Sequence, residues 1–230
     1  NRRKSHRHLE MVAGVTMISF SAVWVKLVHV GPTTIGFYRM LFGVSILFLI
    51  VLFKRARLWY GWQPFLLGTL LGLLFAGDLT VWHRSILAVG PGLATVLGNF
   101  QVFILAAFGI LVLRERPGWK ALAAIPMAMV GLLLIVGPKW QNVDATYKLG
   151  ILFGLATACF YASYVLVLKK LVSRSDAPPP LINVTVSTCA TAVAMGLIAL
   201  LQGESFAIPD TQSLLVLIVY GLCGQVLGWL

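Results

Sequence analysis

The feature that most constrains this chain is a series of apolar runs, each about as long as a helix that crosses a lipid bilayer. Such a helix needs about 20 mostly apolar residues to span the hydrocarbon. Eight such runs follow one another, at residues 9–30, 33–53, 64–87, 91–113, 119–136, 149–171, 180–201 and 213–230. Short loops with Gly and Pro separate them. We therefore predict an all-α integral membrane protein with eight transmembrane helices.

The composition excludes the soluble classes of protein. Hydrophobic residues make up 59% of the 230 residues and charged residues 11%, whereas a soluble domain carries about 25% charged residues. Three cysteines, at positions 159, 189 and 223, lie far apart inside apolar runs. No second type of metal ligand lies near them in the sequence, so neither a disulfide framework nor a metal site is predicted. We expect no cofactor.

The net charge of +11 arises from Lys and Arg residues between the apolar runs. If the N-terminus is inside, thirteen of them lie at the inner side: Arg2, Arg3, Lys4, Arg7, Lys54, Arg55, Arg57, Arg114, Arg116, Lys120, Lys169, Lys170 and Arg174. Only Lys139 and Lys148 lie at the outer side. Cytoplasmic loops carry an excess of Lys and Arg. The pattern predicts a cytoplasmic N-terminus and a lipid bilayer, not a nucleic acid, as the partner.

Weak internal similarity relates the beginning of the chain to its end. Runs one and six align at an offset of 140 residues, and runs three and eight at an offset of 147, which pairs Gly77-Asp78-Leu79 with Gly224-Gln225-Val226. Five runs, an odd number, separate the equivalent helices, so the two copies cross the membrane in opposite directions. Inverted repeats are typical of secondary transporters that alternate access around a central site. Shared apolar composition is the alternative explanation.

The repeat also predicts how the chain is divided. Residues 1–140 form a first unit of five helices, and residues 141–230 form a second unit of which three helices are present. A complete second unit would need two more helices after Leu230. We therefore expect an inverted repeat of five-helix units, with eight transmembrane helices here of an expected ten.

Several short motifs resemble those of EamA-domain transporters in the drug/metabolite transporter superfamily. They are Phe37-Tyr38-Arg39, Trp82-His83-x-Ser85-Ile86, Gly90-Pro91-Gly92-Leu93-Ala94-Thr95, Leu113-Arg114-Glu115-Arg116 and Gly131. Members commonly carry a proline one turn into the fourth helix, where this chain has Asn99-Phe100-Gln101. The resemblance implies ten helices in two inverted repeats and a metabolite carrier of the bacterial inner membrane. It implies no particular substrate.

Two ionisable residues inside the apolar runs are the main candidates for substrate binding or coupling. Charged groups in hydrocarbon are costly and usually functional. Asp78 either exchanges a proton as substrate binds or forms a structural ion pair with Arg39 or Lys26. Arg39 either captures a carboxylate or phosphate or bonds to Asp78 or to exposed carbonyls. Gln225, the repeat counterpart of Asp78, is polar but uncharged, which suits coupling to a single proton.

Further candidates for the site are aromatic and amide side chains in the runs. Trp24, Trp82 and Tyr164 either line a cavity and stack on the substrate or pack against lipid and neighbouring helices. Asn99 either bridges helices or faces the cavity. Pairs of glycines four residues apart predict close contact between helices, at Gly68 and Gly72, Gly150 and Gly154, and Gly224 and Gly228.

These features favour a secondary transporter of small molecules rather than an enzyme. The sequence has no Walker A loop, so the proton-motive force or substrate exchange is left to drive transport. The excess of positive charge near the outer side favours amino-acid-like or anionic substrates. The alternatives are a membrane-embedded enzyme acting on lipid-linked substrates and a non-transporting membrane scaffold. The sequence leaves open whether the protein is a homodimer.

Overall fold

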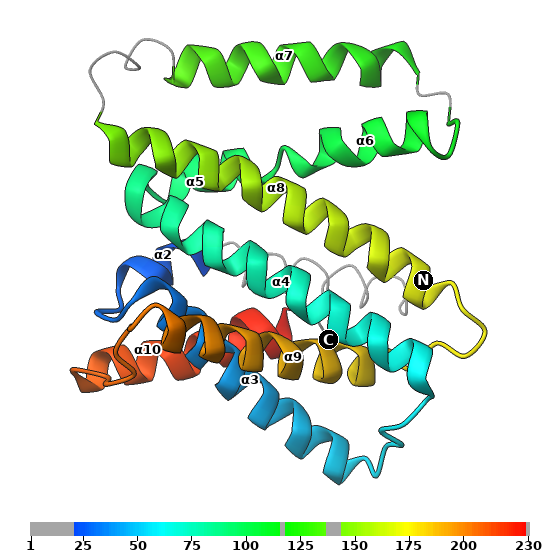
Figure 1. Cartoon of the computed structure of the whole chain (residues 1–230), viewed down its shortest axis with the longest axis vertical. Helices are drawn as coiled ribbons and strands as arrows, with labels where there is room; N and C mark the ends of the chain where they lie inside the picture. The colour runs from blue at the N-terminus through cyan, green and yellow to red at the C-terminus, as the bar shows by residue number, and fades with distance from the viewer. Residues whose placement is uncertain (1–20, 116–117, 137–143, 229–230) are drawn as a thin grey trace, which may run out of the picture.

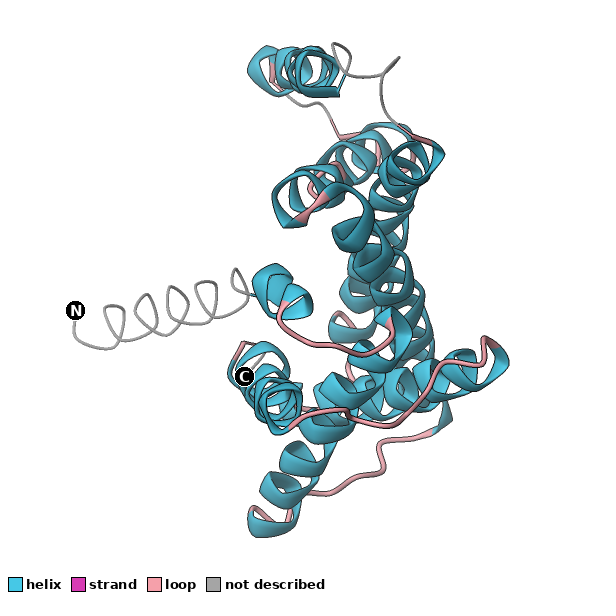
Figure 2. Cartoon of the chain, turned by 90° about the vertical axis from the view of Figure 1, so that its left-hand side faces the viewer, coloured by secondary structure: helices cyan, strands magenta, loops and turns pink. Residues whose placement is uncertain are grey.

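The computed structural model describes residues 21–115, 118–136 and 144–228, which are helical and contain no β-strand (Figures 1 and 2). The helices are α2 (Ser21–Lys26), α3 (Pro32–Phe53), α4 (Trp62–Val89), α5 (Pro91–Gly98), α6 (Gln101–Leu111), α7 (Trp119–Val136), α8 (Ala145–Val172), α9 (Pro180–Leu201) and α10 (Thr211–Gly221). Helix α10 continues directly into a π-helical segment, Leu222–Leu227.

Five segments of the described chain are long and apolar enough to cross a membrane, at Pro32–Phe53, Trp62–Val89, Pro91–Leu111, Ala145–Val172 and Pro180–Leu201. They coincide with predicted runs two, three, four, six and seven. Shorter apolar helices occupy runs five and eight, at Ala123–Leu134 and Thr211–Leu227. Most of run one lies outside the described residues. The all-helical prediction is confirmed for this part of the chain, and the number of eight spans stays a prediction.

Apolar side chains cover the surface of the bundle, and polar side chains are common inside it. Leu134 is 70% exposed and Leu201 is 87% exposed. Thr33, Thr188 and Thr191 are almost fully buried. A soluble protein rarely exposes so many large apolar side chains. In hydrocarbon this arrangement is favourable, because lipid solvates the apolar surface and polar groups find partners between helices.

Helix α4 lies at the centre of the bundle, where it packs most extensively against α8 and α9. Helix α3 packs against α9, α10 and the π-helical segment, and α5 and α6 pack against α8. Figure 1 shows α7 at one edge of the molecule and α3, α9 and α10 at the other. The functional candidates on α3 and α4 therefore lie where both halves of the sequence meet.

Glycines allow the closest approaches between these helices. A Cβ atom at Gly72 would lie 2.5 Å from the carbonyl oxygen of Ser187 on α9. A Cβ atom at Gly150 would lie 2.5 Å from the Cβ of Ala88 on α4, and one at Gly154 would lie 2.7 Å from Leu97. The predicted close contacts at Gly68 and Gly72 and at Gly150 and Gly154 are thereby confirmed.

Alanine substitutions at two helical glycines are expected to change stability in opposite directions. Gly72→Ala forces α4 away from the α9 backbone, and such overpacking costs about 1–3 kcal/mol. Gly131 in α7 has nothing within 4 Å of an added Cβ. Gly131→Ala is therefore expected to stabilise the protein by up to about 1 kcal/mol, through the higher helix propensity of Ala. Unfolding of the purified protein in mixed micelles measures both changes, and a stabilising Gly72→Ala would contradict the packing.

The fourth predicted run is not one continuous helix. It breaks between α5 and α6 at Asn99 and Phe100. The Asn99 side-chain amide donates to the carbonyl of Thr95 at 2.9 Å, and the Phe100 N–H bonds to Leu97, three residues back. Local side-chain bonds of this kind compete with regular helix. Hydropathy does not detect the break because the flanking residues are apolar on both sides.

Aspartates cap the first turns of α8 and α10. Asp144 accepts a hydrogen bond from the Tyr147 N–H at 2.9 Å at the start of α8, and Asp210 accepts one from the Ser213 N–H at 2.6 Å at the start of α10. The Ser213 bond is the main reason why the pKa of Asp210 is lowered. A lowered pKa means that this cap stabilises the folded protein at neutral pH and loses its effect as the pH falls through that pKa.

Candidate functional site

Arg39 of α3 is buried at the contact between α3 and the last part of the chain. Its Nη1 donates to the Tyr220 hydroxyl at 2.9 Å and its Nη2 donates to the Gly224 carbonyl at 3.1 Å. The guanidinium carbon lies 4.5 Å from the centroid of the Tyr220 ring and 5.9 Å from that of Phe75. Cation–π contacts of this kind stabilise a desolvated cation. Of the two structural roles considered for Arg39, bonding to a carbonyl is the one observed.

Asp78 of α4 is 5% exposed, and its Oδ1 is a buried atom without a hydrogen-bond partner among the described residues. The guanidinium of Arg39 lies 5.9 Å from the centroid of the Phe75 ring, one turn before Asp78 on α4. No ion pair joins the two groups, since the described pairs involve other residues. Lys26 is exposed and donates to the carbonyl of Leu87. The structural ion pair of Asp78 with either cation is therefore not formed.

Gln225 enters the same region from the π-helical segment. Its Nε2 donates to the Thr188 hydroxyl of α9 at 2.7 Å, and its Oε1 is buried without a partner in the described chain. A Cβ atom at Gly43 would lie 2.8 Å from the Gln225 side chain, so α3 needs glycine there. Short π-helical segments often mark functional sites. Arg39, Asp78, Thr188, Tyr220 and Gln225 are called the central polar site below.

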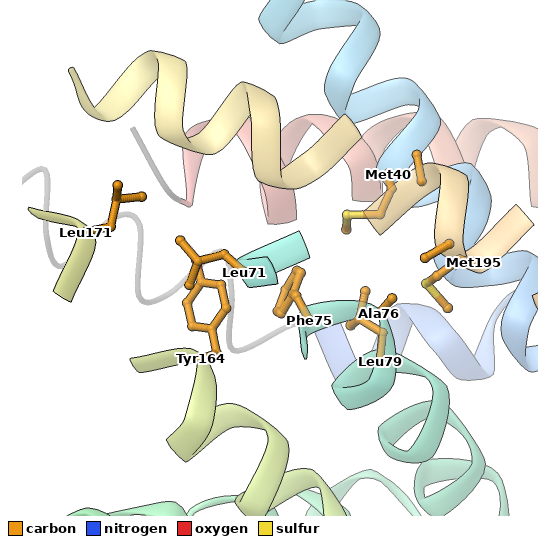
Figure 3. Close-up of a cluster of buried hydrophobic side chains, with 10 residues drawn as sticks. Met40, Leu71, Phe75, Ala76, Leu79, Tyr164, Leu171 and Met195 are labelled. Atoms are coloured by element: carbon orange, nitrogen blue, oxygen red, sulfur yellow. The ribbon is translucent and has the colours of Figure 1, made fainter. Parts of the chain in front are cut away.

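Aromatic side chains connect the central polar site to a cavity. The ring of Phe75 lies 5.6 Å from that of Tyr164, which lies 5.7 Å from that of Tyr161. Figure 3 shows Phe75 and Tyr164 in a row of buried side chains between Leu171 and Met195. Tyr164 also lines a cavity of about 380 Å³. The rest of its wall is mostly apolar, comprising Leu71, Leu168, Val172, Ala177, Pro178, Pro180, Asn183, Val184 and Ser187.

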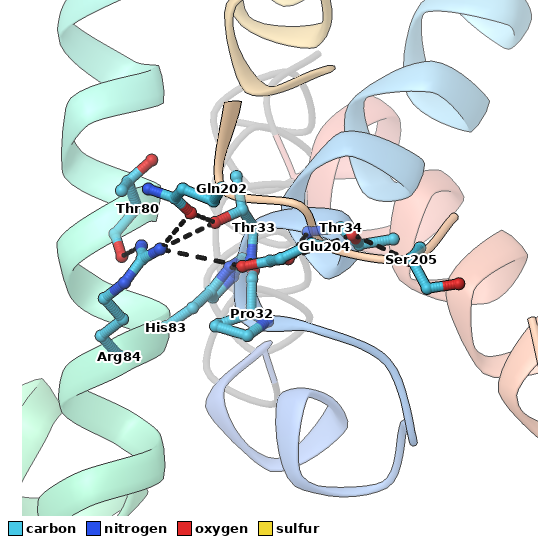
Figure 4. Close-up of polar contacts among 9 residues, drawn as sticks. All are labelled: Pro32, Thr33, Thr34, Thr80, His83, Arg84, Gln202, Glu204 and Ser205. Atoms are coloured by element: carbon cyan, nitrogen blue, oxygen red, sulfur yellow. Dashed lines mark hydrogen bonds and ion pairs between the residues drawn. The ribbon is translucent and has the colours of Figure 1, made fainter. Parts of the chain in front are cut away.

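A second group of polar residues lies at the opposite end of the same helices. It consists of Thr33, Thr34, His83, Arg84, Gln202 and Glu204, and is called the Glu204 cluster (Figure 4). It joins the first turn of α3 and the last turns of α4 to the loop after α9. The cavity, by contrast, lies where α8 ends and α9 begins. The two features therefore lie at the two ends of the bundle.

The structure brings together some of the predicted site residues and separates others. Arg39, Asp78 and Gln225 belong to the central polar site. Trp24 contacts it through the ring of Tyr220 at 5.6 Å, and Tyr164 through Phe75. Trp82 is partly buried on α4 between two apolar clusters. Asn99 lies apart, exposed at the break after α5.

Sequence reasoning missed Tyr220, Thr188 and Glu204. Tyr220 lies one turn before Gly224, so a helical projection of the last run would have placed these two residues on the same face. Thr188 carries no comparable signal, because Thr is common in membrane helices. Glu204 follows directly after an apolar run, and its acidity at a helix end was the available signal.

Comparison with known proteins identifies the family of the chain. Residues 8–137 match the EamA-like transporter family. No match was found among curated proteins. The matched region covers more than half of the chain and includes both Arg39 and Asp78. Together with its apolar helices, this match makes the protein a multi-pass integral membrane protein. The chain belongs to the EamA-like transporter family, within the drug/metabolite transporter superfamily.

Proposed function

We propose that this protein is a secondary transporter that moves small metabolites across the bacterial inner membrane by alternating access. The observation that carries the proposal is the burial of Arg39 and Asp78, without an ion pair between them, at the junction of α3, α4 and the π-helical segment. Ionisable groups inside membrane proteins are costly and mark substrate or ion pathways. The central polar site is the proposed binding site.

Two inverted repeats, at residues 1–140 and 141–230, are supported by a pair of matching glycine contacts. A Cβ atom at Gly72 would meet the backbone of Ser187 and Thr191 on α9. A Cβ atom at Gly221 would meet the backbone of Arg39 and Gly43 on α3. Residues 187 and 191 follow residues 39 and 43 by 148 positions, the offset that also relates Pro32 to Pro180.

The helix contacts follow the same symmetry. Under the repeat, α3 corresponds to α9 and α4 corresponds to α10 with the π-helical segment. Helix α3 packs against α9, as two equivalent helices beside a symmetry axis would. Helix α4 packs against α9, and α10 with the π-helical segment packs against α3. Such exchange of equivalent contacts supports a site at the interface between the repeats, near the middle of the membrane.

The unmet hydrogen-bonding atoms favour a zwitterionic, amino-acid-like substrate. Both Nη atoms of Arg39 already donate within the protein, and Nε is the buried donor left without a partner among described residues. Asp78 Oδ1 and Gln225 Oε1 are buried acceptors without partners there. One cationic donor and a carboxylate acceptor complement a carboxylate and an ammonium group. Of the amino-acid-like and anionic substrates that the sequence favours, this combination favours the amino-acid-like ones.

The proposed orientation places the N-terminus in the cytoplasm. Lys54, Arg55, Arg57, Lys169 and Lys170 are exposed on the loops and helix ends beside the cavity. The Glu204 cluster then faces outward. The excess of Lys and Arg around the cavity end supports this assignment. Whether the protein forms a homodimer stays open.

Flux through the full-length protein in proteoliposomes tests the proposal. The assay offers radiolabelled amino acids, the amines that lack their carboxylates and the acids that lack their amino groups. We expect saturable uptake of at least one amino acid and at least about tenfold weaker competition by its amine and acid analogues, since each loses one charged partner. Equal competition by the acids alone would favour an anionic substrate. Absence of saturable flux for the amino acids, the amines and the acids would contradict the proposal that the protein is a transporter.

A further inference from the structure

Glu204 holds the first turn of α3 from outside that helix. Its carboxylate accepts from the Thr34 N–H at 2.8 Å, the Thr34 hydroxyl at 3.0 Å and the Thr33 N–H at 3.3 Å. Helix α3 begins with Gly31 and Pro32 and has no side-chain cap of its own. A carboxylate at a helix N-terminus is stabilised by the free N–H groups and the helix dipole. The second half of the sequence thus supplies the cap for a helix of the first half.

Arg84 ties α4 to the same loop. It lies 3.7 Å from Glu204 in an ion pair and donates to the Thr33 hydroxyl and to the side-chain oxygen of Gln202 (Figure 4). Its side chain is 22% exposed and that of Glu204 is 14% exposed. Partly buried pairs in a network contribute more than exposed pairs. The Glu204 cluster therefore joins α3, α4 and the loop after α9 at one point.

The chain is closely packed at His83, within this cluster, and directly below the cluster. His83 is fully buried and its Nδ1–H donates to the Pro32 carbonyl at 2.9 Å. A Cβ atom at Gly36 would overlap the end of the Met195 side chain. Tyr38 donates to the carbonyl of Phe206 at 2.6 Å, which adds a second tie to the loop after α9. The bundle is thus closed between the Glu204 cluster and Arg39.

The opposite end of the same helices contains a cavity. The cavity of about 380 Å³ lies between the end of α8 and the start of α9, and reaches Leu71 and Tyr164. The ring of Phe75 lies 5.6 Å from that of Tyr164 and 5.9 Å from the guanidinium of Arg39, so this aromatic pair lies between the cavity and Arg39. A polar tie at one end and a cavity at the other are the two elements that alternating access requires of a single conformation.

We infer that Glu204 and Arg84 form the outer gate of the transport pathway, and that the structure is the inward-facing state in which this gate is closed. The inference rests on the proposed function and on its orientation. Opening the gate requires Glu204 to leave the α3 N-terminus and Arg84 to leave Glu204. The cavity beside Tyr164 is then the cytoplasmic vestibule, which closes when the outer gate opens.

Cysteine accessibility in the full-length protein tests the gate without knowledge of the substrate. Cys159, Cys189 and Cys223 are first replaced by Ala. One reporter, Met195→Cys, lies below the gate, and the other, Val184→Cys, lines the cavity. A membrane-impermeant maleimide is then applied from outside to right-side-out vesicles and from the cytoplasmic side to inverted vesicles. In the otherwise unchanged background we expect labelling of Val184→Cys from the cytoplasmic side and no labelling of Met195→Cys from outside.

Glu204→Gln and Arg84→Gln are each expected to shift the two reporters in opposite directions. Outer labelling of Met195→Cys should rise and cytoplasmic labelling of Val184→Cys should fall, each by at least about fivefold, the lower range of typical coupling between two states. Asp210→Asn is the matched control, because Asp210 is an acid on the same side that caps α10 and makes no contact with Glu204 in the described structure. It should leave both reporters unchanged.

The outcomes separate the gate from the transporter itself. If both reporters keep their labelling in Glu204→Gln and in Arg84→Gln, the gate is wrong, even if flux is measured. If the reporters shift reciprocally while no substrate series shows saturable flux, the gate stands and the transport proposal fails. Equal increases at both reporters in both gate variants would indicate loss of packing instead of a switch, and would also overturn the gate.

Discussion

Arg39→Leu is expected to abolish saturable flux and to lower the free energy of unfolding by about 3 kcal/mol. Hydrogen bonds to charged groups contribute about 1.5–3 kcal/mol each, and this change removes the donors to Tyr220 and Gly224. Part of the loss is offset because the desolvated guanidinium is removed as well. Loss of the bond to Gly224 also releases the π-helical segment from Arg39 of α3, so Gln225 is held less firmly in the site.

One further variant separates the charge of Arg39 from its shape, and a second variant serves as its control. Arg39→Lys keeps the charge but loses the planar fork that reaches two acceptors at once. It is expected to recover part of the stability and to transport about tenfold more slowly, which corresponds to about 1.4 kcal/mol. Arg57→Leu is the control, because Arg57 is exposed and its guanidinium lies 5.8 Å from the Tyr60 ring. Its stability should change by less than about 0.5 kcal/mol.

Thermal unfolding in detergent and uptake into proteoliposomes measure the two effects. Wild-type flux in Arg39→Leu would remove Arg39 from the binding site and, with it, the strongest support for a transport pathway at this position. If Arg39→Leu keeps wild-type stability but loses flux, the bonds to Tyr220 and Gly224 contribute to substrate transport more than to the stability of the fold.

The helical spans were predictable because hydrocarbon imposes a single solution on the backbone. Every N–H and C=O group within the membrane must be satisfied inside its own segment, which favours helices of a known length. The run predicted at 180–201 coincides with α9, and the run predicted at 64–87 lies within α4, which extends from Trp62 to Val89. Charge and hydropathy carry enough information for this level of the structure.

The helix break at Asn99 and the π-helical segment at Leu222–Leu227 were not predictable in the same way. Both lie inside continuous apolar stretches. They depend on single hydrogen bonds, such as Asn99 to Thr95, and on the contact of Arg39 with the Gly224 carbonyl. A hydropathy window averages over such contacts. The run predicted at 91–113 coincides with the span Pro91–Leu111, but its division into α5 and α6 was not predicted for this reason.

The candidate site was only partly predictable from the residue types. Buried charge identified Arg39 and Asp78, and the repeat offset identified Gln225. Their partners depend on the rotation of each helix about its axis, which the sequence leaves undetermined in uniformly apolar helices. Bonding of Arg39 to Tyr220 and Gly224, rather than to Asp78, required the structure. The role of Glu204 at the α3 N-terminus required it as well.

Asp78→Asn is expected to abolish uptake driven by a pH gradient while preserving exchange of substrate across the membrane. A carboxylate in hydrocarbon without a partner is costly, and Oδ1 of Asp78 has no hydrogen-bond partner among the described residues. Binding and release of a proton, in step with the substrate, would relieve this cost in each state. Asparagine keeps the shape and the polarity but cannot carry the proton.

The repeat counterpart explains why one proton per cycle is expected. Gln225 replaces the carboxyl with an amide whose Nε2 is held by Thr188 at 2.7 Å. The site therefore has one titratable side and one neutral side. Gln225→Glu would supply a second carboxyl and is expected to raise the number of protons moved per substrate toward two, measured as the pH gradient that balances a given substrate gradient.

Proteoliposomes with an imposed pH gradient distinguish these results. Wild-type protein should accumulate substrate against its gradient, and Asp78→Asn should only equilibrate it, with accumulation reduced at least about tenfold, as expected when a coupling worth about 1.4 kcal/mol or more is lost. Asp176→Asn is the control, since Asp176 is exposed and pairs with Arg174 outside the spans, where that bond lowers its pKa. It should keep full accumulation. Retained accumulation in Asp78→Asn would place proton coupling elsewhere, whereas loss of both accumulation and exchange would leave Asp78 with substrate binding alone and no role as the proton carrier.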